Sequence, residues 1–136
     1  MLNKKDLSLV GATLYLCEGT KARVDSRGTK NFSVEFTNID PRTIKIFLEF
    51  LRKVIKIDEK RLKAQLFYYP DHTVERLIDY WSKVTQIPKE RFTKPIKLIQ
   101  KNKKYKPNPK GILKIRYHHK IHFLKIQGII NKIFGS

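Results

Sequence analysis

The chain contains little cysteine and no long apolar run. Cys17 is the one cysteine among 136 residues, which excludes an internal disulfide framework and is typical of a reducing compartment. We expect Cys17 to be a small buried hydrophobic residue. No stretch is long and apolar enough to span a membrane, and the first residues lack the apolar core of a secretion signal. These features predict an intracellular protein.

Acidic residues are also few. Asp and Glu number 12 against 30 Lys and Arg, which gives a net charge of +18, and none of the acids lies beyond Glu90. So large an excess of positive charge is typical of proteins that bind a polyanion. Nucleic acid is the first candidate for this partner, and an anionic membrane is the second. The basic residues fall mainly in predicted strands and loops rather than along one amphipathic helix, which disfavours the membrane.

The spacing of apolar residues predicts a single α+β domain over residues 1–136, with an antiparallel sheet whose helices cover one face. The expected order is helix, hairpin, helix, strand, helix, two strands and helix. We expect helices over 7–18, 40–57, 71–85 and 120–134. We expect a hairpin over 21–38 and strands over 61–69, 94–100 and 112–119.

Three local features of these helices can be predicted as well. Asp6 or Ser8 is expected to cap the first helix, and Gly19 to end it in a left-handed conformation. The last helix is expected to bury a stripe of four apolar residues, namely Ile121, Leu124, Ile129 and Ile133.

Alternation along the strands predicts a polar face opposite the helices. The residues expected on it are Arg23, Asp25, Arg27, Lys63, Gln65, Lys97, Lys114, Arg116 and His118. Arg and Gln make bidentate contacts to base edges, and Lys neutralises phosphates. A curved antiparallel ribbon of this kind fits the major groove of duplex DNA. The alternative is an ordinary solvated face, but such faces usually balance the two signs of charge.

A second basic element is the segment 101–111, which is rich in Lys, Asn and Pro. Four lysines in it are candidates for contacts along a phosphate backbone: Lys103, Lys104, Lys106 and Lys110. A disordered surface loop is the alternative, and the two interpretations are compatible.

The stretch "GATLYLCEG" at residues 11–19 carries a family resemblance. It resembles the LAGLIDADG motif of homing endonucleases: Ala12, Leu14 and Gly19 match, and Glu18 takes the place of the final aspartate. "VEFTNIDPRTIKIFLEFLR" looks like the strand and helix that follow in that family, and "LKIRYHHKIHFLKIQGIINKIF" like its closing strand and helix. Thr13 and Leu16 depart from the motif, and residues 71–93 look like an inserted helix.

The resemblance implies a homodimer that cuts a specific site in double-stranded DNA with Mg²⁺ or another divalent cation. It implies a helix–helix interface formed by Ser8, Gly11, Ala12 and Tyr15. It implies that Glu18 and Gly19 hold the metal, which removes the penalty of a carboxylate at the negative end of a helix. The candidates for catalysis are Glu18, Gln65, Lys97 and Lys114, the last three by position only.

Other interpretations remain open. The departures at Thr13 and Leu16 favour a DNA-binding regulator that does not cleave. A curved, basic sheet surface can also bind structured RNA by its shape, which fits an RNA-splicing cofactor. The two DNA-binding hypotheses imply a nucleoid-associated location. Glu18 can also be an ordinary exposed carboxylate.

The remaining histidines and aromatic residues carry less information. His118, His119 and His122 fit neither a zinc site nor a catalytic triad, which leaves phosphate contact or packing. Tyr80 and Trp81 are expected on a helix face and in the core.

Overall fold

The computed structural model of the protein describes residues 2–20, 23–24, 30–99 and 109–135. They form an α+β fold whose elements follow the expected order. The helices are α1 (Lys4–Glu18), α2 (Pro41–Glu49), α3 (Val74–Thr85) and α4 (Lys120–Phe134), with short helical turns η1 (Phe50–Ile55), η2 (Glu59–Arg61) and η3 (Lys89–Arg91). The strands are β1 (Arg23–Val24), β2 (Lys30–Asn31), β3 (Ser33–Asn38), β4 (Leu62–Tyr68), β5 (Ile96–Lys97) and β6 (Ile112–His118).

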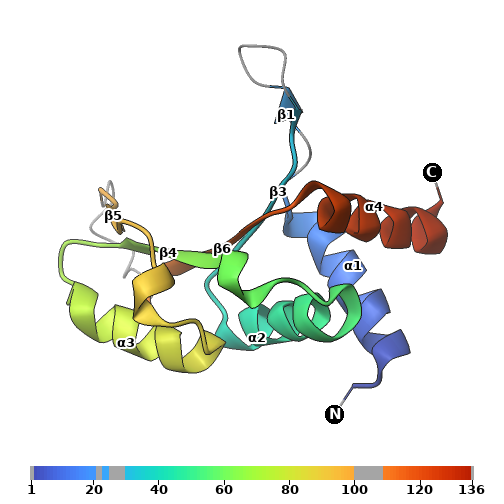
Figure 1. The fold of residues 1–136 in the computed structure, drawn as a ribbon. Coiled ribbons are helices and arrows are strands. Elements are labelled where there is room, and N and C mark those ends of the chain that lie inside the picture. Colours follow the sequence, from blue (N-terminus) through green and yellow to red (C-terminus); the bar gives the residue numbers. More distant parts are fainter. Residues whose placement is uncertain (1, 21–22, 25–29, 100–108, 136) are drawn as a thin grey trace.

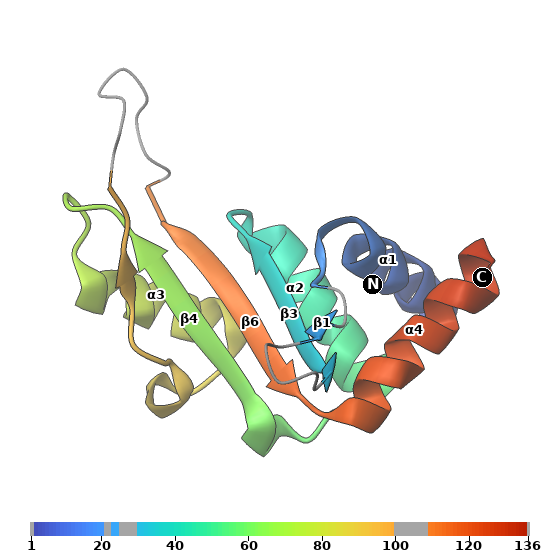
Figure 2. The same ribbon diagram turned by 90° about the horizontal axis from the view of Figure 1, so that it is seen from above.

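The main sheet has four strands in the order β3-β6-β4-β5, and β1 pairs with β2 in a separate two-stranded ladder. Figure 1 shows α2 and α3 below the sheet, with α1 and α4 beyond β3. Figure 2 looks from above on to the face of the sheet that these helices leave uncovered. We call this the open face; it consists of the outward side chains of β3, β6 and β4.

The expectation of an antiparallel sheet is wrong at one edge. β3, β6 and β4 are antiparallel, but β5 runs parallel to β4. The reason is α3, which lies between β4 and β5 in the chain and returns it to the end where β4 began. A strand that follows such a crossover lies parallel to the strand before it. The sheet is therefore mixed.

The core lies between the sheet and the helices. Asp40 caps α2, with its Oδ1 accepting from the Arg42 amide at 2.9 Å, and Pro41 occupies the first turn. The apolar residues that recur at helical spacing in this helix are buried, but the helix is not regular: after Glu49 it continues as the π-helical turn η1. Phe50 in that turn lies against the backbone of α1 at Gly11, where an added Cβ would come within 2.0 Å of the ring. Glycine is therefore required for α1 and η1 to approach each other.

The ends of α1 differ from expectation. The helix begins at Lys4, because the Asn3 side chain caps it by accepting from the Asp6 amide at 2.8 Å. Gly19 ends it in an extended conformation (φ −78°), not a left-handed one. Glycine is needed there for a different reason, since an added Cβ would meet the ring of Tyr15 at 2.3 Å.

The predicted stripe of α4 is also wrong. Ile121 is 71% exposed, Leu124 and Ile133 are exposed too, and Ile129 is only partly buried. The helix is apolar around much of its circumference, so its periodicity alone does not select a face. The buried residues are Phe123, Ile126 and Ile130.

Candidate nucleic-acid interface

The open face is built from register-matched rows across β3, β6 and β4. One row joins Glu35, Arg116 and Lys63, and the next joins Thr37, Lys114 and Gln65. His118, opposite Ser33, ends the face. Their neighbours along each strand are buried, so the predicted alternation is confirmed for Lys63, Gln65, Lys114, Arg116 and His118.

A carboxylate lies at the centre of this face. Glu35 Oε1 is 3.5 Å from Lys114 Nζ, and its Oε2 is 3.8 Å from Arg116 Nη2. The Glu35 side chain is 16% exposed, against 42% for Arg116. The two cations therefore share one partly buried counter-charge and remain accessible to a ligand.

One end of the face is apolar. Phe67 lies opposite Ile112 on β6 and Ile96 on β5, and Lys114 Nζ lies 5.4 Å from the centre of the Phe67 ring. Nucleobases and thymine methyl groups are the parts of a nucleic acid that suit such a surface.

Lys97 does not lie where the alternation predicted. In the parallel register it stands beside Tyr68, on the side of β4 opposite to Phe67 and the open face. Both residues of this two-residue edge strand are exposed, so alternation alone does not select the face on which Lys97 lies. Lys97 is exposed at the sheet edge, but it is not in the row of Lys114 and Gln65.

Gln65 is on the open face but already has a partner. Its Nε2 donates to the carbonyl of Lys94 at 2.9 Å, which ties β4 to the segment before β5. The structure therefore brings Gln65 and Lys114 into one row, but each has an intramolecular contact of its own.

Glu18 lies at the carboxyl end of α1, next to β3. The following residue, Gly19, forms a β-bridge with Phe36, and Thr20 donates to the Glu35 carbonyl at 3.0 Å. The exposed Glu18 side chain accepts from Asn38 Nδ2 at 2.6 Å. This contact, which links Glu18 to the end of β3, was not expected from the sequence.

The helix face expected to pair with a second chain is instead inside the subunit. Gly11, Ala12 and Tyr15 are buried, and Ser8 is only partly exposed. Tyr15 stacks on Phe47 and its hydroxyl donates to the carbonyl of Thr20. Burial raises the pKa of Tyr15 to about 12. The small residues thus serve the protein's own core, and the predicted interface is wrong.

The outward side of α1 carries different residues. Leu9 is 51% exposed and Leu16 is 37% exposed, with the half-buried Thr13 between them. Cys17 is exposed on the same helix, so its expected burial is wrong.

Two histidines, His119 and His122, pack together at the start of α4. The rings of His119 and His122 stack with centroids 4.0 Å apart, and His122 Nδ1 lies 2.7 Å from the hydroxyl of Tyr117. Burial is the main cause that lowers the pKa of His122, and the charges of His119 and Lys125 add to it. His119 and His122 therefore have the packing role that was one of the two alternatives, whereas His118 is exposed on the open face.

At the far end of the sheet, Trp81 is buried and donates from Nε1 to the carbonyl of Lys110 at 2.7 Å. Lys110 Nζ lies over the ring of Tyr80, 4.5 Å from its centre. The expected core and helix-face roles of Trp81 and Tyr80 are confirmed. Several predicted contacts lie outside the described residues, namely Asp25, Arg27, Lys103, Lys104, Lys106 and the side chain of Arg23.

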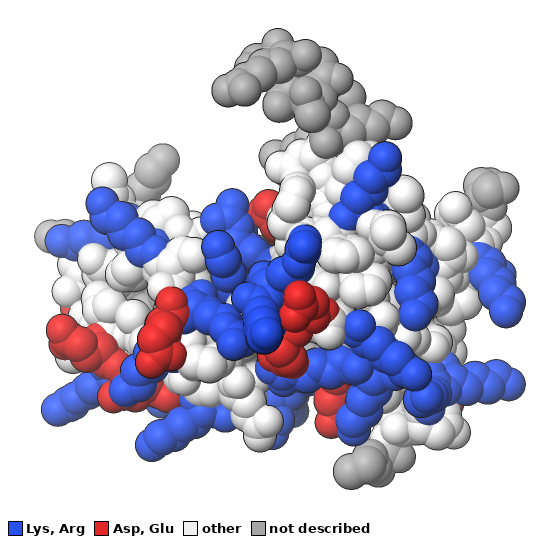
Figure 3. Space-filling view, in the orientation of Figure 1, with Lys and Arg blue, Asp and Glu red and all other residues white. Residues whose placement is uncertain are grey.

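A second group of cations was missed in the sequence. Figure 3 shows Lys and Arg side chains gathered across the middle and lower right of one side of the molecule, over η2 and η1. The chain turns sharply here, at Lys56, and brings together residues that the sequence assigns to a helix and a strand. The run "RKVIKIDEKRLK" at 52–63 was the available signal.

Within the described ranges, no three His, Cys, Asp or Glu side chains lie close enough together to hold a metal ion. None of the helices in those ranges has the length and apolar character that a membrane span requires.

Comparison with known proteins adds no assignment. No protein-family model matches this chain, and no match to it was found among curated proteins or solved structures.

Proposed function

We propose that this protein binds duplex DNA through the open face of its sheet. The observation that carries the proposal is the group of cations formed by Lys63 on β4 and Lys114 and Arg116 on the adjacent β6, with Glu35 as the only acid among the described residues of that face. Cations at this density neutralise phosphates, and arginine can bond guanine edges bidentately. The net charge of +18 supports the same partner.

The finer proposal is a metal-dependent, site-specific DNA endonuclease of the LAGLIDADG type. The resemblance at residues 11–19 supports it, and so does the order of helices and strands. The exposed carboxylate of Glu18, beside the end of β3, is available to a ligand near the proposed DNA surface. Glu18 is therefore the residue on which cleavage is proposed to depend.

Glu18 and Gly19 are the residues that would hold Mg²⁺. An exposed carboxylate fits this ion, because Mg²⁺ is usually bound by one or two carboxylates and keeps several waters. When bound, the ion would supply an activated water and stabilise charge on the phosphate. Asn38, through its 2.6 Å hydrogen bond, orients the Glu18 carboxylate.

We also propose that the protein acts as a homodimer, through a different face of α1 from the one expected. The exposed leucine Leu9 and the half-buried Thr13 lie on the side of the helix that the subunit leaves uncovered. Association of two such faces would remove exposed apolar surface from water. It would also bring two copies of Glu18 to one DNA.

A non-cleaving DNA-binding regulator is the second candidate, and a specific observation favours it. Gln65 donates to the Lys94 carbonyl and Lys114 is paired with Glu35, so two groups proposed to orient water are engaged elsewhere. Lys97 stands beside Tyr68, away from both. With these groups occupied, the fold can still bind DNA through its cations.

The experiment is incubation of the protein with a randomised duplex library in Mg²⁺ and, separately, in Ca²⁺. A nuclease binds in both and cuts in Mg²⁺, and the Glu18→Gln variant then binds but does not cut. Glu90→Gln, which changes an exposed carboxylate on η3, is the matched control and cuts normally. Binding without cutting supports the regulator. Binding to structured RNA with no binding to duplex contradicts both DNA functions and supports a splicing cofactor.

A further inference from the structure

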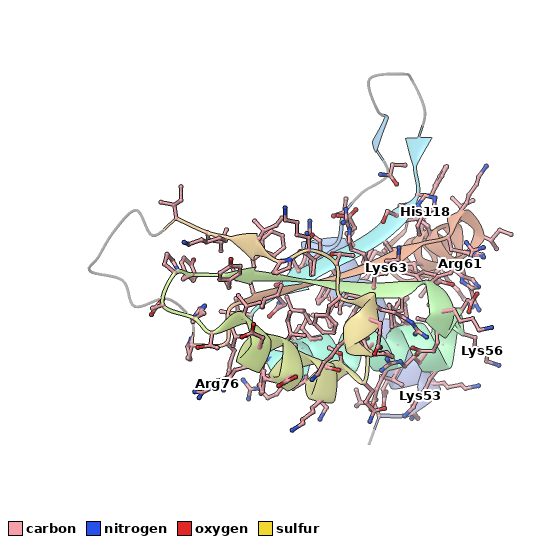
Figure 4. The ribbon with its side chains drawn as sticks, turned by 60° about the vertical axis from the view of Figure 1, so that its left-hand side comes forward. Lys53, Lys56, Arg61, Lys63, Arg76 and His118 are labelled. Atoms are coloured by element: carbon pink, nitrogen blue, oxygen red, sulfur yellow. The ribbon has the colours of Figure 1, made fainter. Side chains whose placement is uncertain are left out.

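A second basic surface begins where the open face ends. We call it the basic flank and define it as Lys53, Lys56, Lys60 and Arg61, which come from η1, the residue after it, and η2. Figure 4 shows Arg61, Lys56 and Lys53 one below another along the right-hand edge, from the level of the sheet to the level of the helices. His118 lies at the top of this series, whereas Arg76 on α3 lies well apart.

Hydrogen bonds fix the flank to the sheet. Arg61 Nη1 donates to the carbonyl of His118 at 3.3 Å, and the Asp58 amide donates to the Tyr117 hydroxyl at 2.9 Å. The next open-face residue on β4 is Lys63, two positions after Arg61. The flank and the open face are therefore one continuous surface held on ordered elements.

The acids around the flank are already paired. Glu59 pairs with Arg52, Asp58 with Arg61 at 3.7 Å, and Glu49 with Lys53 at 3.9 Å. In the part of the chain that the structure describes, no carboxylate lies within ion-pair distance of Lys56 or Lys60, which are both exposed. An ordinary solvated surface would balance these two charges more closely.

Lys56 is also in an unfavourable backbone conformation. It ends η1 with φ 61° and ψ 58°, in the left-handed region that suits glycine or asparagine better than lysine. Gln86 ends α3 in the same region, so the conformation alone does not mark a binding surface. At Lys56, however, the backbone cost coincides with an exposed, unpaired ammonium group, and a stability role does not explain the choice of lysine.

We propose that the phosphate backbone of a bound DNA duplex continues from the open face on to the basic flank, where Lys56 and Lys60 each neutralise a phosphate. This inference rests on the proposed function, because it extends the same DNA contact. Two observations on the molecule select a phosphodiester backbone as the occupant: the continuity with the cationic open face, and the exposed ammonium groups of Lys56 and Lys60, which have no carboxylate partner among the described residues. Because the proposed contacts of the flank are with phosphates and not with base edges, the flank adds affinity without sequence preference.

The test compares the salt dependence of binding to a long duplex for three proteins. They are the wild type, the flank variant Lys56→Gly/Lys60→Gln, and the control Arg76→Gln/Lys83→Gln, which removes the same charge from exposed positions on α3. Each neutralised phosphate contributes about 0.9 to the slope of log K against log salt. The slope of the flank variant should therefore be shallower than that of the wild type by about 2, while the control keeps the wild-type slope.

A footprint on the same duplex gives a second readout. Phosphates beyond the region contacted by the open face should be protected by the wild type and the control, and exposed in the flank variant. Lys56→Gly should also have a thermal midpoint at or above that of the wild type, because glycine relieves the left-handed residue. If this variant alters the fold, Lys56→Asn/Lys60→Gln repeats the measurement, because asparagine also tolerates the left-handed conformation at this position.

The outcomes separate the two proposals. If the wild type binds no duplex, the proposed function itself is wrong. If the wild type binds and the flank variant has the same slope and footprint, the open face binds DNA and the flank inference is overturned. A flank variant that weakens binding only to structured RNA, or only to another protein, overturns it as well.

Discussion

Replacing Glu35 by glutamine tests the electrostatics of the open face most sharply. The substitution keeps the shape of the side chain and removes the one acid from the centre of the described face. Lys114 Nζ at 3.5 Å and Arg116 Nη2 at 3.8 Å lose their shared counter-charge. We therefore expect Glu35→Gln to bind duplex DNA more tightly than the wild type at low salt.

The size of the effect follows from the geometry. Arg116 is 42% exposed and Lys114 is 25% exposed, so solvent screens both pairs and the stability loss should not exceed about 1 kcal/mol. One cation is released to neutralise a phosphate, which steepens the slope of log K against log salt by about 0.9. A small cost in stability thus accompanies a measurable gain in binding.

The assay is a salt titration of binding, paired with denaturant unfolding of each variant. Asp79→Asn is the control, because it raises the net charge by the same amount on α3, where Asp79 pairs with Lys89. The control should leave the slope unchanged. If Glu35→Gln binds with the wild-type slope, or if both variants gain equally, then Glu35 faces no phosphate and the open face is not the DNA surface.

Three further changes test the fold and the dimer. Gly11→Ala should cost about 1–3 kcal/mol of unfolding free energy, because the new Cβ would lie within 2.0 Å of the Phe50 ring; an unchanged denaturant midpoint would contradict the packing. Burial raises the pKa of Tyr15 to about 12 in the folded state, against about 10 for an ordinary tyrosine, so wild-type stability should fall by about 2–3 kcal/mol as pH rises from 10 to 12. Tyr15→Phe should lack that fall, and equal slopes of stability against pH would refute the assignment. Leu9→Lys should shift the sedimentation mass from dimer to monomer without unfolding the subunit, and a wild type that is monomeric would contradict the dimer.

Most of the secondary structure could be predicted from the sequence, because strong periodicity marks these elements. The stripe of α2 and η1, with Ile44, Phe47 and Leu48 buried, follows directly from helical spacing. The alternation of β4 and β6 likewise predicts which of their side chains are buried. The π-helical turn could not be predicted, since the spacing of apolar residues does not distinguish a π-helical turn from an α-helical one.

The errors share one physical cause, which is that a local pattern does not specify its partner. The small residues Gly11 and Ala12 indicate close helix packing, but the pattern cannot distinguish the protein's own η1 from a second chain. The two-residue strand β5 acquires its direction from the α3 crossover. The basic flank depends on the turn at Lys56, whose left-handed conformation no local signal specifies.

The central claim is that the open face of the sheet binds the phosphate backbone of duplex DNA. Its most direct test is the slope of log K against log salt for the wild type and for Lys63→Gln/Arg116→Gln, two neighbours in one row. We expect a steep wild-type slope that becomes shallower by about 2 in the variant. A flat wild-type response, or the same slope in both proteins, would contradict it.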